Sequence, residues 1–476
     1  MRALSAEPGA ETNSPPEPDS VPDILVAGAG ACGLVAALRA AELGATVAVL
    51  EKLDRMAGNT MLSTGSIPAA GTRFQTALGI TDAPSVMAAD INRLAGDHDA
   101  EHLVTTLAQR SAEVVHWLAD RCGVAMKLMS QYRHVGHSVP RLHAPLGGRG
   151  SDLLDALAAA ADRAGIPVLF GNRVTDLIDD GGRIAGVEVT SGGNRYMVRT
   201  RSVILATNGF AANPALMARF APEIADARYF GAAGSEGEAI VWGERLGAAI
   251  GNAAAWQAHA SIAAPHGELL TWSIPEKGGF FVNREGRRFG NETLGYSGFA
   301  AQVIAQGNQA WAIYDARIRD EVASIQPPFR DLVAHGGARD FPSIEALAQA
   351  HGLPPATVSA TLGSYADAAN GVARDPFGRK DFGRAPLEPP FVATRVEAGL
   401  FHTQGGLMVD DRARVLRADG SVIENLFAGG GAAVGVSGRA GGAGYASGNG
   451  LLSATVLGYI AGETAARAAL LPPPRC

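Results

Sequence analysis

The sequence predicts an α/β protein in which a nucleotide-binding domain is built from two separated segments and a second domain is inserted between them. Three observations favour this fold class. A strand, a glycine-rich turn, a helix and a second strand follow one another between Asp23 and Lys52. After Asn252 the chain becomes richer in aromatic residues and in loops with Pro and Gly. From Leu400 onward a glycine-rich segment restores the nucleotide-binding character, which indicates a sheet domain with an insertion.

The first segment has the spacing of a phosphate-binding turn. Ile24 to Ala27 is an apolar run, and Leu34 to Leu43 is an Ala/Leu-rich helix. Between them, Gly28, Gly30 and Gly33 follow the spacing G-x-G-x-x-G. The first glycine permits a tight turn, the second lets the backbone approach a pyrophosphate, and the third lets helix and strand pack closely, as in a Rossmann-like fold.

A carboxylate completes this motif. Glu51 ends the second strand about 20 residues after the turn, where it is placed to accept hydrogen bonds from an adenosine ribose. The small and polar residues from Gly58 to Ser66 suit backbone that wraps around a long cofactor. We therefore expect a bound dinucleotide, and the alternative is a glycine-rich turn without a ligand.

Composition limits the function classes. The chain has 476 residues, 47% of them hydrophobic and 18% charged, which is typical of a globular protein with a large core. The net charge of −7 argues against nucleic acid as a partner. No apolar run is long enough for a membrane span, and residues 1–20 are predicted to form a disordered tail without the apolar centre of a signal peptide.

The three cysteines, Cys32, Cys122 and Cys476, are scattered. This spacing argues against a disulfide framework and against a metal site, and it fits a reducing cytoplasm. Cys32 lies inside the glycine turn, where a redox role and a small residue packed under a helix are the two interpretations.

The remaining pattern predicts alternating helices and strands around long loops. Helices are expected at 34–43, in two or three pieces within 83–122, at 151–164 with Ser151 as the N-cap, at 238–246 and at 451–466. Strands are expected at 24–27, 46–50, 166–170, 173–178, 184–190, 203–207 and 426–428, with 407–409 and 413–416 as a hairpin. Residues 126–150 are expected to form a polar loop.

Gly, Ala and Ser dominate the chain from Gly429 to Gly450, just before the last helix. This segment is either a flexible linker or a surface of backbone N–H groups. In the second case these groups and the helix dipole face an electron-rich part of a ligand, such as a reduced flavin ring.

Several motifs resemble the flavoprotein superfamily of fumarate reductases, 3-ketosteroid Δ1-dehydrogenases and related desaturases. They are GAGACG at 28–33, GNTMLSTGSIPAAGT at 58–72, VILATNGFAAN at 203–213, FFVNREGRRFGNE at 280–292, HTQGG at 402–406, and NLFAGG and SGNGLLSATVLGYIAG near the end. The resemblance covers nearly all of residues 21–470. It implies an FAD-binding domain in discontinuous pieces, 21–257 and 396–470, and an α+β capping domain at 258–395 that encloses a small-molecule substrate against the flavin.

The resemblance also implies which residues hold the cofactor. They are Gly28, Gly30, Ala31, Cys32, Gly33, Glu51, Lys52, Asn59, Thr60, Ser63, Thr64, Gly65, Val174, Ala206, Thr207, Asn208, Gly209, Gly429, Gly430, Asn449, Leu451 and Leu452. Members with covalent flavin carry a histidine where this chain has Asn59, Thr60 and Met61, so we expect non-covalent FAD.

Two departures distinguish this chain from the fumarate reductases. Where those enzymes have an arginine that delivers the proton, this chain has Tyr296, and where they have a substrate-binding arginine it has Tyr445. Tyrosines in both places are similar to the ketosteroid-dehydrogenase arrangement. Desaturation beside a ketone needs a donor to the carbonyl oxygen, a base for the α-proton and a hydride acceptor. We assign Tyr445 as the donor and Tyr296 as the base, provided that nearby positive charge lowers its pKa from ~10. Otherwise each is an ordinary buried or loop tyrosine.

Three further residues are candidates for substrate binding. His143 and His402 fall where fumarate-reductase-like members have substrate-binding histidines, although each is equally compatible with a structural role. Arg439 is either a clamp for a carboxylate or a solvated loop arginine, and Arg141 is a weaker candidate. If the histidines and an arginine line the pocket, the substrate is a small keto acid or a cyclic ketone with a carboxylate.

The sequence therefore predicts an FAD-dependent desaturase of a cyclic ketone or keto acid, such as 4-oxocyclohexanecarboxylate, or of a 3-ketosteroid. An external electron acceptor or oxygen would reoxidise the flavin, and without a second dinucleotide fingerprint NAD(P)H is not expected as a direct partner. One alternative is a fumarate-reductase-like enzyme that reduces an unsaturated carboxylate. The other alternative is a flavin-binding protein without catalytic activity. An inserted capping domain argues against it, because a cap over the flavin suggests a substrate to enclose.

Overall fold

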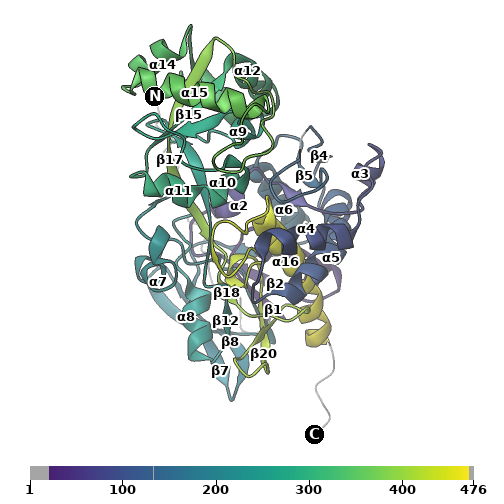
Figure 1. The fold of residues 1–476 in the computed structure, drawn as a ribbon. Coiled ribbons are helices and arrows are strands. Elements are labelled where there is room, and N and C mark those ends of the chain that lie inside the picture. The colour runs from purple at the N-terminus through teal and green to yellow at the C-terminus, as the bar shows by residue number, and fades with distance from the viewer. Residues whose placement is uncertain (1–20, 132, 471–476) are drawn as a thin grey trace, which may run out of the picture.

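The computed structural model describes residues 21–131 and 133–470, so the predicted tail at 1–20 lies outside the described residues. Two hydrophobic cores are present, and Figure 1 shows the part around the second core, in green, above the purple and yellow part around the first. The mixed α/β composition agrees with the fold class that the sequence predicts. The first core surrounds the nucleotide-binding sheet.

This sheet has nine strands, seven of them in the order β6-β2-β1-β10-β20-β8-β7, while β19 pairs with β20 and β9 with β8. Strands β6, β2, β1, β10, β20 and β8 pair in parallel, and β7, β8 and β9 form an antiparallel extension. The strands are β1 (Ile24–Ala27), β2 (Val47–Leu50), β6 (Val168–Leu169), β7 (Arg173–Asp180), β8 (Arg183–Ser191), β9 (Asn194–Arg199), β10 (Ser202–Leu205), β19 (Arg414–Leu416) and β20 (Val422–Ala428).

The turn between β1 and α1 (Ala31–Glu42) forms as the glycine spacing predicts. Gly28 has a φ of 109°, and a Cβ there would lie 2.4 Å from the carbonyl oxygen of Ala206. A Cβ on Gly33 would lie 1.8 Å from the carbonyl oxygen of Gly28. Both positions therefore need glycine, because any side chain would separate α1 from the sheet.

Helix α16 (Asn449–Leu470) packs along α1 through small residues. A Cβ on Gly458 would lie 2.5 Å from the carbonyl oxygen of Cys32, and one on Gly462 would lie 2.2 Å from that of Ala36. The absence of side chains at these positions lets the two backbones approach closely. The end of the chain is thereby fixed against its beginning.

Other helices cover the first core and the loops around it. They are α2 (Asn59–Leu62), α3 (Arg73–Thr76), α4 (Pro84–Ala95), α5 (Glu101–Asp120), α6 (Gly150–Arg163), α7 (Pro214–Phe220) and α8 (Glu238–Arg245). Short strands β3 (Ile67–Pro68), β4 (Met126–Leu128) and β5 (Leu142–Pro145) form a separate small sheet, and β12 (Ile250–Gly251) pairs with β18 (Gly406–Leu407).

The second core lies around a mainly antiparallel sheet in the order β14-β15-β17-β13-β21, with β11 and β16 paired to β17. Its strands are β11 (Arg228–Tyr229), β13 (Ala254–Ala263), β14 (Phe280–Val282), β15 (Ala310–Asp315), β16 (Arg339–Phe341), β17 (Phe391–Thr403) and β21 (Ala440–Gly441). Its helices are α9 (Ser273–Glu276), α10 (Gly295–Gly298), α11 (Ala300–Ala305), α12 (Ala316–Ile325), α13 (Pro327–Ala334), α14 (Ile344–Ala350) and α15 (Pro355–Ala369). We call this part the capping domain.

Three local predictions differ from the structure. Ser151 is not an N-cap, because α6 begins at Gly150, whose amide donates to the carbonyl oxygen of Ser63 (2.7 Å). The predicted loop 126–150 contains β4 and β5, which pair with each other. The predicted hairpin is reduced to a bridge between Val409 and Val415, because the neighbouring strands pair elsewhere, β18 with β12 and β19 with β20.

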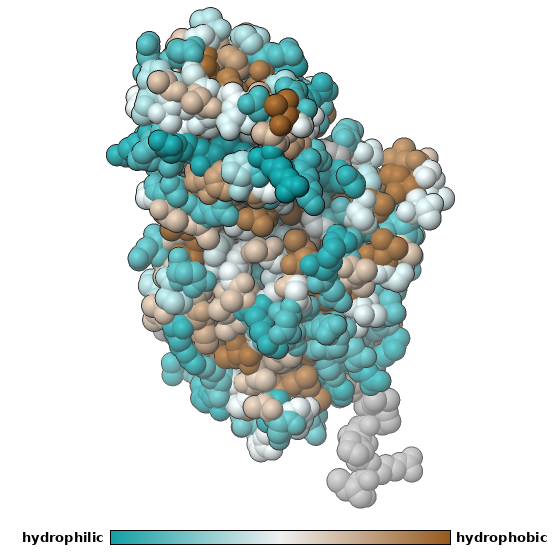
Figure 2. Space-filling model, viewed as in Figure 1, coloured by the Kyte–Doolittle hydropathy of each residue, from teal (hydrophilic) through white to brown (hydrophobic). Residues whose placement is uncertain are grey.

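One face of the surface mixes hydrophobic and hydrophilic residues. On the face drawn in Figure 2, hydrophobic residues occur in several separate places among hydrophilic ones. Within 21–131 and 133–470, no helix combines the length and the apolar character needed to cross a bilayer.

Candidate functional site

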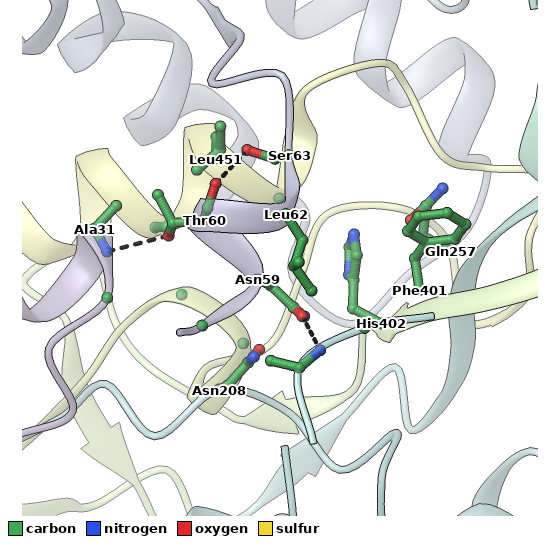
Figure 3. Close-up of a pocket in the computed structure, with 18 of the residues that line it drawn as sticks. Ala31, Asn59, Thr60, Leu62, Ser63, Asn208, Gln257, Phe401, His402 and Leu451 are labelled. Carbon is green, nitrogen blue, oxygen red and sulfur yellow. Dashed lines mark hydrogen bonds between the residues drawn. The ribbon is translucent and has the colours of Figure 1, made fainter. Parts of the chain in front are cut away.

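A cavity of about 2300 Å³, including its open mouth, lies between the nucleotide-binding sheet and the capping domain. Its lining runs from Gly28 and Glu51 beside the sheet to Tyr296 and Glu276 in the capping domain, so the cavity can face a cofactor and a second molecule. Figure 3 shows α2 between the turn at Ala31 on one side and His402 and Phe401 of β17 on the other. The cavity thus has a half near the sheet and a half near the capping domain.

In the half near the sheet, Glu51 holds the glycine turn. Its two carboxylate oxygens accept the amides of Ala29 (2.9 Å) and Leu53 (3.0 Å). A carboxylate has further lone pairs, so Glu51 retains acceptor capacity for a ribose hydroxyl. The side chain therefore shapes the turn and also faces the cavity.

Helix α2 closes the other side of this half (Figure 3). Thr60 Oγ1 accepts the amide of Ala31 (3.2 Å), and Asn59 Oδ1 accepts the amide of Ala232 (2.7 Å). Ser63 Oγ donates to the carbonyl oxygen of Thr60 (2.7 Å). These bonds fix the small polar segment that the sequence assigns to a long cofactor.

Two features of this half fit a dinucleotide. A Cβ on Gly30 would meet only Thr60 Oγ1, at 3.8 Å, so it would project into open space where the turn faces the cavity. Thr207 lines the cavity, and its Oγ1 is a buried oxygen without a hydrogen-bond partner in the described part of the chain. An open backbone cradle and an unsatisfied hydroxyl are what a bound cofactor would fill.

Most predicted cofactor-binding residues line this cavity. They are Gly28, Gly30, Ala31, Cys32, Glu51, Lys52, Asn59, Thr60, Ser63, Thr64, Val174, Ala206, Thr207, Asn208, Gly429, Gly430 and Leu451. Burial raises the pKa of the Cys32 thiol to about 12, so the thiol stays protonated. A protonated, buried thiol favours the interpretation of Cys32 as a small packed residue over a redox role.

Five of the predicted residues lie behind the cavity wall instead. Gly33, Gly65 and Gly209 would each bring a Cβ within 3 Å of neighbouring protein atoms. Asn449 is buried and its Nδ2 donates to Ser437 Oγ (3.2 Å), while Leu452 belongs to the first core. These residues support the cavity through packing and do not face it.

Aromatic rings surround the half near the capping domain. The imidazole of His259 stacks on the Tyr296 ring at 4.9 Å between centroids, and the Tyr445 ring meets the Tyr296 ring edge-on at 6.0 Å. His402 contacts the Tyr445 ring edge-on at 5.5 Å. The structure therefore brings Tyr296, Tyr445 and His402 together, from three distant parts of the sequence.

Tyr445 is a neutral hydrogen-bond donor in this arrangement. Its hydroxyl oxygen accepts the amide of Gly450 (3.2 Å), and burial raises its pKa to about 12. A phenol that accepts one bond retains its own proton for a second partner. Tyr445 can thus donate to an oxygen bound in the cavity.

The histidines of this half are neutral as well. Burial lowers the pKa of His259 to about 3 and that of His402 to about 4. Ser261 donates its amide to His259 Nδ1 (3.2 Å), so the proton of the neutral ring lies on Nε2. The positive charge that the base role of Tyr296 requires is therefore not supplied by the imidazole stacked on it.

Sequence reasoning did not identify Gln257 or His259, which both line the cavity. They occupy alternate positions of β13, so they lie on one face of that strand. A Gln-x-His pattern inside an otherwise apolar strand was the available signal, because buried polar side chains need a local reason.

His143 and Arg439 lie outside the cavity lining, so the structure does not bring them together with Tyr296 and Tyr445. Arg439 is exposed and pairs with Asp97 and Asp99, both at 2.8 Å. His143 is fully buried behind the wall, where its Nε2 lies 2.8 Å from Thr72 Oγ1. Burial lowers its pKa to about 4.

Arg141 is also structural. Its buried guanidinium pairs with Asp82 at 2.9 Å and with Asp90 at 2.7 Å. Its charge is therefore satisfied inside the protein.

Positive charge is scarce in the cavity. No arginine lines it among the described residues, and the lysine that does, Lys52, pairs with Glu236 and Glu238. Carboxylate ligands are usually held by arginine or lysine. The cavity is thus better suited to an uncharged or cationic molecule than to a dicarboxylate.

Comparison with known proteins places these features in a family. The model of the family described as "FAD binding domain" matches residues 23–450. A fumarate reductase (cytochrome) of Shewanella frigidimarina is 30% identical over 459 residues, covering 94% of this chain and 78% of that protein. A 4-oxocyclohexanecarboxylate 2-dehydrogenase of Sinomonas cyclohexanicum is 26% identical over 552 residues, covering 94% and 93%.

A solved structure shows the same likeness. The 3-ketosteroid-Δ4-(5α)-dehydrogenase of Rhodococcus jostii RHA1, in complex with 4-androstene-3,17-dione, superposes with a TM-score of 0.75 at 28% identity. The match covers 94% of this chain and 97% of that one.

Proposed function

The chain belongs to the FAD binding domain family of flavoprotein oxidoreductases, and we propose that it desaturates a cyclic ketone that carries no carboxylate group. The product would carry a double bond between the carbons α and β to the carbonyl group. The observation that carries this proposal is the pair Tyr296 and Tyr445, which meet edge-on in a cavity lined by no arginine among the described residues.

Each tyrosine has a role in this reaction. Tyr445 donates its hydroxyl proton to the ketone oxygen and stabilises the negative charge that develops there. Polarisation of the carbonyl acidifies the α-carbon, and Tyr296, ionised to the phenolate before this step, accepts the proton that this carbon loses and becomes a neutral phenol. FAD, held without a covalent bond, supplies the acceptor for the hydride that leaves the β-carbon.

The surrounding residues support these steps. The stacked imidazole of His259 restricts the Tyr296 ring to one orientation. The amide of Gly450 fixes the hydroxyl of Tyr445. Because neither histidine carries charge, the cavity polarises a substrate through hydrogen bonds rather than through an ion pair.

The proposal differs in one respect from what the sequence alone favours. A keto acid such as 4-oxocyclohexanecarboxylate would need a cation at its carboxylate, and Arg439 is bound to two aspartates instead. A ketone without a carboxylate, with 3-ketosteroids among the candidates, avoids the cost of an unpaired carboxylate.

The test is an anaerobic titration of the purified flavoprotein with saturated cyclic ketones, in which the visible absorbance of oxidised flavin is followed. Bleaching by an uncharged ketone would support the proposal. Tyr296→Phe and Tyr445→Phe should each retain FAD and slow bleaching by about 100- to 1,000-fold.

Tyr459→Phe is the matched control, because Tyr459 lies in α16 outside the cavity and hydrogen-bonds Glu113 (3.0 Å). It should bleach at the rate of the unmodified protein. Bleaching unaffected by Tyr296→Phe would remove that residue as the base. Failure of every ketone, with rapid reoxidation of reduced enzyme by fumarate, would support the reductase alternative instead.

A further inference from the structure

The capping-domain end of the cavity is polar, although aromatic rings surround its middle. Thr271, Ser273, Glu276 and Gln326 line this end. Gln326 Nε2 donates to Ser273 Oγ (2.9 Å), which ties the start of α13 to α9. The polar end is therefore an ordered group of side chains.

A chain of ring contacts separates this end from Tyr445. The Tyr445 ring touches the Tyr296 ring at 6.0 Å between centroids, and the Tyr296 ring meets that of Trp272 at 6.5 Å. Trp272 directly precedes α9, which carries Ser273 and Glu276. A molecule whose oxygen binds Tyr445 would pass these rings before it reaches Glu276.

The carboxyl group of Glu276 faces the cavity without a partner. It forms no hydrogen bond or ion pair within the described part of the chain, whereas its neighbour Lys277 pairs with Glu321 (2.6 Å). Arg379, which donates to the carbonyl oxygen of Pro275 (2.6 Å), pairs with Glu292 (3.1 Å). The nearby cations are thus engaged with other carboxylates.

An unpaired acid in this position is costly for the protein. Burial raises the pKa of Glu276 to about 8, against the smaller opposing effect of Lys277, and Asp381 adds to the rise. A ligand that brought a positive charge with hydrogen-bond donors would remove this cost, whereas a carboxylate would increase it.

We propose that Glu276 binds a protonated amine at the end of the substrate remote from the ketone. This inference rests on the proposed function, because it assigns the opposite end of the same molecule to Tyr445. The substrate class would then be a cyclic amino ketone: an apolar ring body between the aromatic side chains, a ketone at one end and an ammonium group at the other.

Two matched probes test the inference: 17β-amino-5α-androstan-3-one and 17β-hydroxy-5α-androstan-3-one. Binding is measured under oxygen-free conditions from the change in the spectrum of the oxidised flavin, at times before any bleaching. The amine should bind about 10- to 100-fold more tightly than the alcohol. In Glu276→Gln this preference should vanish, while affinity for the alcohol stays within about twofold.

The pH dependence gives a second readout. The amine binds the ionised carboxyl group, so its affinity should rise from about pH 6 to about pH 8 in the unmodified protein and stay level in Glu276→Gln. The charged groups near Glu276 include Lys277, Asp381, Glu321, Arg384, Glu292 and Arg379, and all six remain in both proteins.

Glu268→Gln is the control, because Glu268 pairs with His335 (2.7 Å) and does not line the cavity. It should keep the full preference for the amine. Equal affinity for both probes, no binding of either, or a preference that survives Glu276→Gln would overturn the inference. Amine binding that depends on Glu276, without bleaching by either ketone, would leave the inference standing and contradict the proposed desaturation.

Discussion

At the scale of single residues, the Glu276 carboxyl group makes folding stability depend on pH. Its pKa is about 8 in the folded protein, and an unfolded chain gives glutamate a value of ~4.3. The folded protein therefore holds more protons than the unfolded one between these values. This contribution to stability is fully present below about pH 4.5 and is lost as pH rises through about 8.

Glu276→Gln should remove this dependence. Relative to the unmodified protein, the variant should gain about 1–2 kcal/mol of unfolding free energy between pH 5 and pH 8, a value reduced because water can enter the cavity. Denaturant unfolding of the FAD-loaded proteins at both pH values measures the difference. Buried histidines contribute equally to the pH dependence of stability in both proteins, so their contribution cancels in the difference between the two.

Glu244→Gln serves as the comparison, since Glu244 pairs with an arginine, Arg219, and lies outside the cavity wall. It should show the same change in stability from pH 5 to pH 8 as the unmodified protein. A Glu276→Gln variant whose stability tracked the unmodified protein from pH 5 to pH 8 would show that the carboxyl group is hydrated and ionised in solution.

Single residues were predictable where a motif aligned them and not where only the fold brings them together. Tyr296 and Tyr445 could be selected because each replaces a known arginine in a recognisable motif. His259 could not, since its importance comes from stacking on Tyr296, which lies 37 residues away and contacts it only in the folded capping domain. The sequence left Arg439 with two interpretations, because the aspartates with which it pairs, Asp97 and Asp99, are distant in sequence.

At the scale of elements, two glycines in the turn between β1 and α1 have different structural roles. Gly30→Ala should fold normally, because the added Cβ meets no atom closer than 3.8 Å. It should weaken FAD binding by about 10- to 100-fold, because that Cβ occupies space needed by the cofactor. Flavin fluorescence during reconstitution measures the affinity.

Gly28→Ala should instead prevent correct folding. Its φ of 109° and the carbonyl oxygen at 2.4 Å leave no place for a side chain. Gly363→Ala in α15, where nothing lies within 4 Å of the added atom, should change neither property. Unimpaired FAD affinity in Gly30→Ala would mean that the cofactor does not pass this turn.

Elements were predictable where their pattern is local. The order β1, α1, β2 follows from apolar runs and glycine spacing, and the structure has all three within a few residues of the predicted bounds. Strands β4 and β5 were missed because they are three and four residues long and become strands only by pairing with each other and, for β5, with β3. The start of α6 was misplaced by one residue, since contact with Ser63 rather than a local cap fixes it.

At the scale of the whole molecule, the return of glycine-rich chain after residue 400 was sufficient to suggest an inserted domain. The two cores differ from the predicted boundaries at both ends, since Val396 and Leu400 follow residue 395 and still pack into the second core. Phe210, Met217 and Ile240 precede residue 258 but pack into the second core. Their placement depends on contacts with the capping sheet that local sequence does not encode.

The position of β20 in the sheet has a consequence for the order in which the chain can fold during synthesis. The strand lies between β10 and β8, which the ribosome completes more than two hundred residues earlier. At ~5–20 residues per second, β10 waits roughly 10 to 45 s for its neighbour. The ribosome releases strands β13 to β17 of the capping domain in that interval, so the inserted domain can form before the nucleotide-binding sheet is complete. Until β20 is added, the incomplete sheet is the part of the chain most exposed to chaperones and to aggregation.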